Sequence, residues 1–157
     1  MSPNTLVSDS PAATRRLGRG LARLLRPGDV ILLQGDLGAG KTCLAQGLGM
    51  GLRVREPVKS SAFVLVSEYE GRLRMYLADL YRLSGASEAA DLALEENALD
   101  GVLVVEWPDR AWSEMPEERL LMRLEWMGER SRRLTLEPRG ERYGELAQRL
   151  MELGGAS

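Results

Sequence analysis

The chain has 157 residues, enough for one domain with a single hydrophobic core. Hydrophobic residues make up 44% and charged residues 28%, which excludes extensive disorder, and the net charge of −2 disfavours binding nucleic acid by charge alone. One cysteine and no histidine exclude a disulfide framework, an ordinary zinc site and His-dependent nucleophilic catalysis. Residues 1–10 lack a signal-peptide pattern and no apolar run could span a membrane, so we expect a soluble, cytoplasmic protein with no membrane partner.

The first predicted elements lead into and out of a glycine-rich loop. Leucines at helical spacing, preceded by a Ser-Pro pair, predict a helix over residues 11–25. The continuous apolar run Val30–Leu33 is typical of a strand that is buried on both faces of a parallel sheet. We then expect a loop over Gly35–Gly40 and a helix over Lys41–Gly51.

The rest of the chain alternates strand and helix patterns around a second buried strand at Val102–Val105. Glycine-containing pairs at 70–71 and 128–129 predict two hairpins, the second at the sheet edge. The other predicted elements are strands over 63–69, 72–79, 120–127 and 133–137 and helices over 87–99 and 141–153. Because residues 35–42, between the first apolar strand and the next helix, match the phosphate-binding pattern G-x-x-x-x-G-K-[ST], we predict a single domain, 1–157, with a three-layer P-loop NTPase fold. Its sheet is expected to be mixed and mostly parallel, with antiparallel edge hairpins. About 1–10 and 154–157 are expected to be frayed.

Residues 35–42 match the phosphate-binding pattern G-x-x-x-x-G-K-[ST]. Glycines let successive backbone N–H groups point at phosphate oxygens, and the positive end of the following helix points to the same place. Lys41 is expected to reach the β- and γ-phosphates, and the Thr42 hydroxyl to bind Mg²⁺. A chance glycine-rich turn is the alternative. The flanking strand and helix patterns favour phosphate binding, as does a lysine here in a chain with only two lysines among 21 basic residues.

Two carboxylates follow predicted strands and are candidates for the metal side of a nucleotide site. Asp79 follows the strand over 72–79, and Glu106 follows the more buried strand at Val102–Val105. We expect at least one of them to bind Mg²⁺ and the other to orient the attacking water; the alternative is an acid that merely ends a strand. The guanine-binding pattern N-K-x-D is absent, which disfavours a Ras-like GTPase.

The chain resembles the bacterial TsaE (YjeE) family over about residues 11–143. The resemblance is carried by residues 35–42, 63–69, 79–83 and the segment Glu-Trp-Pro-Asp-Arg at 106–110. It implies an ATP- or ADP-binding protein that acts with a TsaD-type transferase and a TsaB-type partner. That complex moves a threonylcarbamoyl group onto the adenosine beside the anticodon of tRNA, and ATP hydrolysis is needed for repeated turnover. Contact with tRNA is expected to be indirect.

The resemblance also implies roles for individual residues. Lys41, Asp79 and Glu106 would be catalytic, and Thr42, Glu106 and Asp79 would hold the metal. A late arginine that approaches the nucleotide matches either Arg132 or Arg133. The residues implied to bind ATP are Thr14, Gly35, Asp36, Leu37, Gly38, Ala39, Gly40, Lys41, Thr42, Cys43, Trp107 and Arg132.

Three features leave alternatives open. Ser60-Ser61-Ala62 stands where the family commonly has Ser-Pro-Thr, so the switch-like threonine is missing. This motivates a nucleotide-dependent binding module with vestigial hydrolysis as one alternative function; a small-molecule P-loop kinase is another, although the chain is short of room for its lid. Arg130, Arg132 and Arg133 fit a solvated hairpin turn better than a phosphate or tRNA contact. Trp112 and Trp126 are expected in the core or packed at the surface, and residues 81–83 are candidates for a partner surface.

Overall fold

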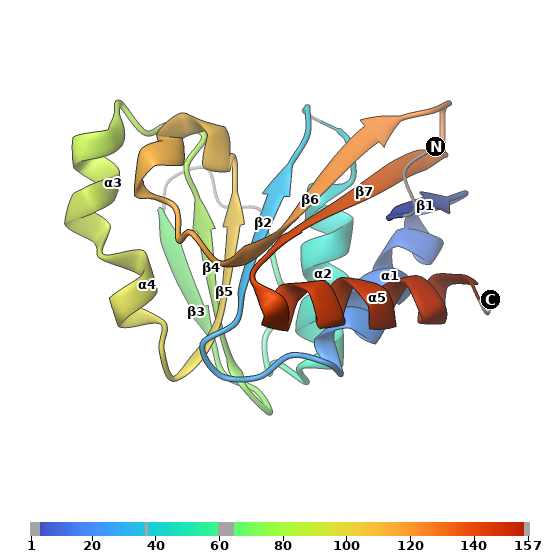
Figure 1. Ribbon diagram of the computed structural model, residues 1–157, viewed down its shortest axis with the longest axis horizontal. Coiled ribbons are helices and arrows are strands. Elements are labelled where there is room, and N and C mark those ends of the chain that lie inside the picture. The colour runs from blue at the N-terminus through green and yellow to red at the C-terminus, as the bar shows by residue number, and fades with distance from the viewer. Residues whose placement is uncertain (1–3, 37, 60–64, 156–157) are drawn as a thin grey trace.

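The fold is built on a seven-stranded sheet in the order β1-β7-β6-β2-β5-β4-β3 (Figure 1). The computed structural model describes residues 4–36, 38–59 and 65–155. β2 pairs in parallel with β5 and β6, and β5 with β4, whereas β3 and β7 run antiparallel to their neighbours. In chain order the strands are β1 (Thr5–Ser8), β2 (Val30–Gln34), β3 (Val66–Tyr69), β4 (Arg74–Asp79), β5 (Gly101–Glu106), β6 (Arg119–Trp126) and β7 (Arg132–Arg139).

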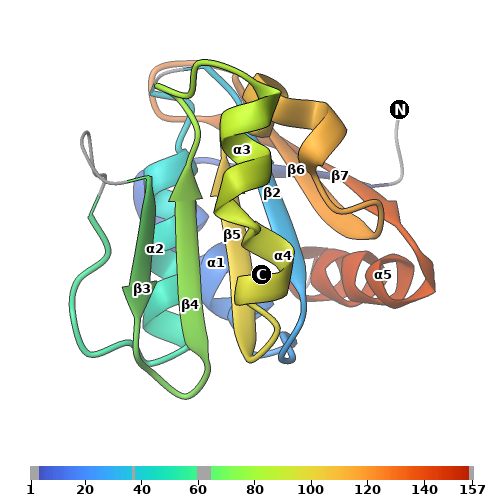
Figure 2. The same cartoon turned by 90° about the vertical axis from the view of Figure 1, so that its left-hand side faces the viewer.

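Helices cover both faces of this sheet and make a three-layer α/β architecture (Figures 1 and 2). One face is covered by α1 (Pro11–Ala22), α2 (Lys41–Gly51) and α5 (Glu141–Gly155). The other face carries α3 (Ala86–Leu92), α4 (Leu94–Asn97) and the 3₁₀ helix η1 (Pro108–Glu114). Among the described residues, no helix is long and apolar enough to cross a membrane.

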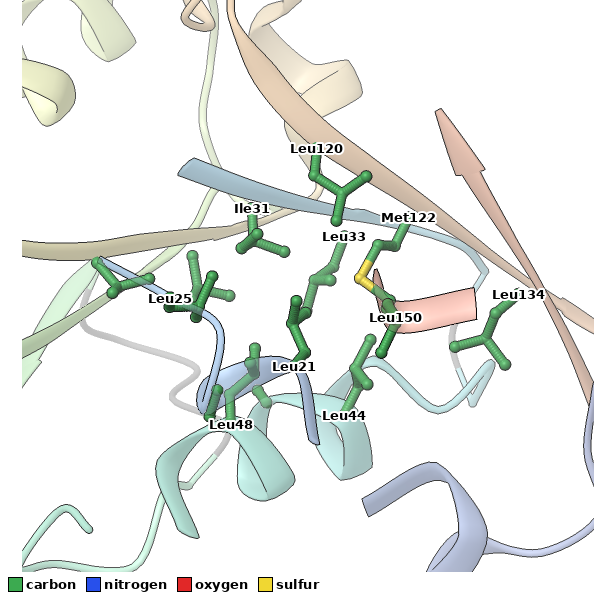
Figure 3. Packing of buried hydrophobic residues seen from close by; sticks show 14 of the residues in the cluster. Leu21, Leu25, Ile31, Leu33, Leu44, Leu48, Leu120, Met122, Leu134 and Leu150 are labelled. Carbon is green, nitrogen blue, oxygen red and sulfur yellow. The ribbon is translucent and has the colours of Figure 1, made fainter. Parts of the chain in front are cut away.

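The central strand β2 divides the apolar core into two clusters. Ile31 and Leu33 belong to the cluster that also contains Leu21 of α1 and Leu44 of α2 (Figure 3). Val30 and Leu32 belong to the cluster on the opposite face, beneath α3, α4 and η1. Because successive side chains of a strand alternate between faces, a strand with both faces covered is apolar throughout, as the sequence predicts for β2.

The structure confirms the predicted fold class and corrects several elements. Thr5–Ser8 form β1, which pairs with β7, so this segment of the terminus expected to be frayed is a strand. For the same reason the β6–β7 hairpin does not form the sheet edge, since β1 lies outside it. The helix predicted over 87–99 is broken at Ala93, whose φ of 46° is left-handed. The helix η1 has no counterpart among the predicted elements.

Candidate functional site

The loop between β2 and α2 has the backbone geometry that a phosphate-binding loop needs. Gly38 has a φ of 79° and Gly40 a φ of 104°, in the left-handed region that favours glycine. Within the loop, the Ala39 N–H donates to the Asp36 carbonyl at 3.0 Å, and the Ala39 side chain is buried. Gly40 is the N-cap of α2 and provides no side-chain cap, so the first N–H groups of the helix keep their hydrogen-bonding capacity.

Lys41, in the first turn of α2, is held by two contacts within the protein. Its side chain is buried, its Nζ donates to the Gly35 carbonyl, and Nζ lies 3.5 Å from the centroid of the Trp107 ring. Burial lowers the pKa of the Lys41 ammonium, and the negative charge of Glu106 opposes that shift most strongly. A buried cation between a carbonyl and an aromatic face is positioned to accept a multiply charged anion.

The two predicted carboxylates lie side by side at the carboxyl ends of their strands. Asp79 ends β4 and Glu106 ends β5, and they are Cα partners in the parallel register. On the other side of β5, Glu106 is the Cα partner of Leu33 in β2. Leu33 is the last residue but one of β2, which leads directly into the P-loop. The topology therefore brings Lys41, Asp79 and Glu106 to one edge of the sheet, as predicted.

Burial makes the two carboxylates different. Glu106 is only 5% exposed, and desolvation, followed by the nearby charge of Asp79, raises its pKa to about 7, while Lys41 lowers it. Asp79 is half-buried, and its Oδ1 accepts the Tyr81 N–H at 3.0 Å. A buried carboxylate with a pKa this high gains the most from a cation placed beside it.

Trp107 reaches Lys41 through an unusual backbone conformation. Its φ is 60°, and its N–H donates to the Leu33 carbonyl at 3.3 Å. Left-handed backbone costs a bulky residue about 1–2 kcal/mol. The Tyr81 ring packs on the Trp107 ring with centroids 4.8 Å apart, and the Arg110 guanidinium lies 5.2 Å from the Tyr81 centroid. Lys41, Trp107, Tyr81 and Arg110 therefore form a continuous series of cation and ring contacts.

The described residues suit a magnesium ion that is shared with a nucleotide. Mg²⁺ prefers oxygen ligands and commonly takes one or two carboxylates together with phosphate oxygens and water. Thr42 begins α2 beside Lys41, and Asp79 and Glu106 supply carboxylates at the same edge of the sheet. Across the described part of the chain no three His, Cys, Asp or Glu side chains could hold a metal by themselves, so phosphate oxygens would complete the shell.

The β6–β7 hairpin reaches the P-loop and contributes contacts that the sequence patterns missed. The Trp126 Nε1–H donates to the Gly38 carbonyl at 3.1 Å, and Arg132 Nη2 donates to the same oxygen at 3.2 Å. The Arg132 guanidinium also lies 4.7 Å from the Trp126 centroid. Trp126 is 59% exposed, so it packs at the surface rather than in the core. Arg133 is exposed, and of the two arginines it is Arg132 that contacts the loop.

Thr14 and Cys43 occupy positions beside this loop rather than in it. Thr14 is fully buried in α1, and its Oγ1 lies 2.6 Å from the hydroxyl of Ser8, the Cα partner of Arg132. Cys43 is half-buried, and its Sγ accepts from Arg15 Nη1 at 3.6 Å. Both are therefore engaged by neighbouring side chains on the α1 side of the P-loop.

A hollow of about 740 Å³ opens beside the P-loop between η1 and β6. Its walls include P-loop residues, Trp107 and Trp126, and the buried Gln34 Oε1 has no hydrogen-bond partner among the described residues. Its lining residues are Gln34, Gly35, Asp36, Ala39, Trp107, Asp109, Arg123, Leu124, Glu125 and Trp126. Of the predicted site residues, Leu37 lies outside the described residues, as do Ser60, Ser61 and Ala62 of the switch-like segment.

The fold and this edge of the sheet define a P-loop nucleotide-binding protein, and the comparisons with known proteins identify which kind. The family model "Threonylcarbamoyl adenosine biosynthesis protein TsaE" matches residues 8–134. The chain belongs to the TsaE family, and its role lies in tRNA threonylcarbamoyladenosine biosynthesis.

Individual relatives support this assignment across most of the chain. The tRNA threonylcarbamoyladenosine biosynthesis protein TsaE of Treponema pallidum is 40% identical over 83% of this chain and 97% of its own length. The protein of the same name from Streptomyces coelicolor is 42% identical over 82% and 93%. The crystal structure of Bacillus subtilis YdiB superposes with a TM-score of 0.77 at 31% identity, covering 95% of this chain and 94% of that one.

Proposed function

We propose that the chain binds ATP with Mg²⁺ at the P-loop and hydrolyses it, as an accessory ATPase of tRNA threonylcarbamoylation in the cytoplasm. Its partners would be a TsaD-type transferase and a TsaB-type protein, and hydrolysis would allow their complex to act repeatedly. One observation carries this proposal: Lys41, Asp79 and Glu106 meet at the carboxyl edge of the sheet, beside a loop with two left-handed glycines.

Each residue has a definite task in this proposal. Backbone N–H groups of the loop and the first turn of α2 would bind the phosphates, and Lys41 would neutralise the β- and γ-phosphate charge. Thr42, Asp79 and Glu106 would hold Mg²⁺, which supplies further charge neutralisation when bound.

Water activation falls to the carboxylate pair. A general base works best with a pKa near the operating pH, and burial gives Glu106 a pKa of about 7 in the absence of a metal, a value that Mg²⁺ beside it would lower. Asp79 is the more exposed of the two and can accept a hydrogen bond from the water. Either carboxylate can orient the attacking water if the other is bound to the metal.

Nucleotide binding requires Lys41 to exchange one partner for another. Its Nζ now donates to the Gly35 carbonyl, which is a neutral acceptor. Phosphate oxygens are charged acceptors, so the ammonium of Lys41 would exchange a contact with a dipole for a direct attraction between opposite charges. The exchange is therefore favourable, and it would also change the contact with Trp107.

The test is magnesium-dependent ATP hydrolysis by the purified protein, alone and with its TsaB–TsaD-type partners and tRNA. The expected result is slow hydrolysis alone, stimulation by the partners, and loss of both in Lys41→Ala. The matched control is Lys59→Ala, which removes the other lysine at an exposed position. Equal hydrolysis by Lys41→Ala and the unaltered chain would contradict the proposal, and a requirement for a phosphate acceptor other than water would point to a kinase.

A further inference from the structure

Positive charge is concentrated in one part of a chain that is acidic as a whole. Residues 11–59 contain nine basic and three acidic side chains, a net charge of +6, and the remainder of the chain carries −8. Of the nine basic residues, Lys41 is the first residue of α2 and Lys59 lies in the loop that follows this helix. Most of the others lie on α1 or follow α2, so the surplus gathers around these two helices.

Helices α1 and α2 pack against each other almost backbone to backbone, because glycines of α2 face α1. A Cβ atom added at Gly47 of α2 would lie 2.2 Å from the Arg15 carbonyl oxygen, and one added at Gly51 would lie 2.5 Å from the Ala22 Cβ. Because no side chain fits between them, the helices meet along a narrow line. Longer side chains on either side of that line must rise to solvent and form the rims of a furrow.

This furrow lies at the end of α2 away from the P-loop, and arginines dominate it. It has a volume of about 530 Å³ and is lined by Arg19, Arg23, Met50, Gly51, Arg53 and Arg72. Arg19 lies in the last turn of α1, and Arg23, four residues later, is the C-cap of that helix. Arg72 lies in the β3–β4 turn, and its Nη2 donates to the Ala22 carbonyl at 2.8 Å. Within the described parts of the chain, none of these four arginines forms an ion pair.

Arg53 lies at a backbone position that disfavours it. It directly follows Leu52, the C-cap of α2, and has a φ of 57°. Glycine is usual at this position because left-handed backbone costs other residues about 1–2 kcal/mol. Arg53 is one of the residues that line the furrow, so a strained backbone position coincides with this surface.

We propose that this furrow binds the phosphate backbone of the tRNA on which the family's pathway acts. Arginine is well suited to phosphate because its planar guanidinium forms paired hydrogen bonds with two oxygens and keeps its charge. Four arginines that form no ion pair with the described residues, in a lining that contains no acid, are the footprint of a polyanion. The inference rests on the chain's role in tRNA modification and not on the proposed hydrolysis.

The position of the furrow allows RNA and nucleotide to bind together. Helix α2 runs from Lys41 at the P-loop to Gly51 in the furrow, and at 1.5 Å per residue its length is about 16 Å. The phosphates of ATP and of RNA would therefore occupy opposite ends of one helix. The proposal is compatible with a net charge of −2 for the whole chain, because an RNA backbone responds to the local charge of the surface that it meets.

The test is the binding of a fluorescently labelled, unmodified tRNA transcript to the full chain at a series of KCl concentrations. About four phosphate contacts predict that the logarithm of the affinity falls with the logarithm of salt with a slope of about −3. The double variant Arg19→Ala/Arg23→Ala should weaken binding at least tenfold at low salt and make the slope shallower by about 1.5. The charge-matched control Arg139→Ala/Arg149→Ala, at exposed positions outside the furrow, should keep the original slope.

Arg53→Gly separates binding from folding. Glycine relieves the left-handed backbone, so the variant should unfold at the same or a higher temperature, yet its salt slope should be shallower by about 1. No salt-dependent binding of tRNA, or an equal loss in the control pair, would overturn the inference. So would loss of partner-protein binding by the furrow variants with tRNA binding unchanged, since the furrow would then be a protein contact.

The same variants keep this inference distinguishable from the proposed ATPase. Lys41→Ala should bind tRNA normally while hydrolysis is lost, because Lys41 is at the other end of α2. The Arg19→Ala/Arg23→Ala variant should retain the basal hydrolysis seen without RNA. If the chain hydrolyses ATP but does not bind RNA, only the proposed RNA site is overturned. If Lys41→Ala still hydrolyses ATP, only the proposed ATPase activity is overturned.

Discussion

The Nζ atom of Lys41 lies 3.5 Å from the centroid of the Trp107 ring, so the P-loop lysine makes a cation–π contact with the residue that follows Glu106. A nucleotide that draws Lys41 onto its phosphates must change this cation–π contact. We therefore expect Trp107 fluorescence to change on addition of Mg·ADP. Trp107→Phe should lose most of the change and Trp112→Phe, in η1, should retain it. An undiminished change in Trp107→Phe would assign the signal to another tryptophan, such as Trp126 on the P-loop, and would contradict the prediction.

Lys41→Ala should weaken nucleotide binding strongly. A hydrogen bond between charged groups contributes about 1.5–3 kcal/mol, which corresponds to a loss of affinity between about tenfold and 150-fold. Isothermal titration with ADP and Mg²⁺ measures this directly. Lys59→Ala should bind as the unaltered chain does, because Lys59 is exposed and follows α2 rather than beginning it. Comparable losses in the two variants would indicate a general effect of charge and not a phosphate contact.

Glu106 should make the protein less stable as the pH rises. Its pKa is about 7 in the folded protein against an ordinary value of 4.5, so the folded state binds the proton more tightly than the unfolded chain does. The resulting penalty is absent below pH 4.5, grows between pH 4.5 and 7, and then stays constant at roughly 3 kcal/mol. Urea unfolding of Glu106→Gln at pH 5 and pH 8 should show a gain in stability relative to the unaltered chain that is larger at pH 8.

The control for this prediction is the metal. Mg·ADP places positive charge beside the carboxylate, and a cation favours the ionised form. In the unaltered chain it should therefore reduce the difference in the free energy of unfolding between pH 5 and pH 8. An equal pH dependence in Glu106→Gln and the unaltered chain would assign the effect to another group.

The sequence predicted those parts of the site that are close together along the chain. The loop Gly35–Gly40, the helix Lys41–Gly51 and the strand before them follow from local patterns, because buried strands are apolar throughout and tight loops need glycine. The meeting of Asp79 with Glu106 also follows, since parallel strands bring their carboxyl ends to one edge of a sheet. These are consequences of short-range chemistry and of one topological rule.

The contacts between distant segments could not be predicted in this way. Trp126 donates to Gly38 across 88 residues of sequence, and nothing around either residue indicates the other. Likewise β1 is too short to show a pattern of its own and exists because β7 offers it an edge. The left-handed backbone at Ala93, which breaks a predicted helix, is a tertiary effect at a residue that favours helices.

Gly47→Ala should destabilise the α1–α2 pair. The new Cβ would lie 2.2 Å from the Arg15 carbonyl oxygen, so the two helices must move apart, at a cost of about 1–3 kcal/mol. Gly144→Ala is the matched control: it also lies in a helix, its new Cβ would meet no atom within 4 Å, and it should stabilise by about 0.5–1 kcal/mol. Urea unfolding gives both values, and a neutral Gly47→Ala would mean that the helices are not in backbone contact.

Arg132→Ala should weaken nucleotide binding by a smaller factor than Lys41→Ala does. Arg132 donates to the Gly38 carbonyl and is stacked on Trp126, so it braces the loop, and the loss of one such hydrogen bond is expected to lower affinity about three- to tenfold. Arg133→Ala removes the same charge from an exposed position one residue away and should leave affinity unchanged. Titration of both variants with Mg·ADP therefore decides between the two arginines that the sequence left open. A loss in Arg133→Ala that matches or exceeds the loss in Arg132→Ala would mean that bracing of Gly38 has no part in binding.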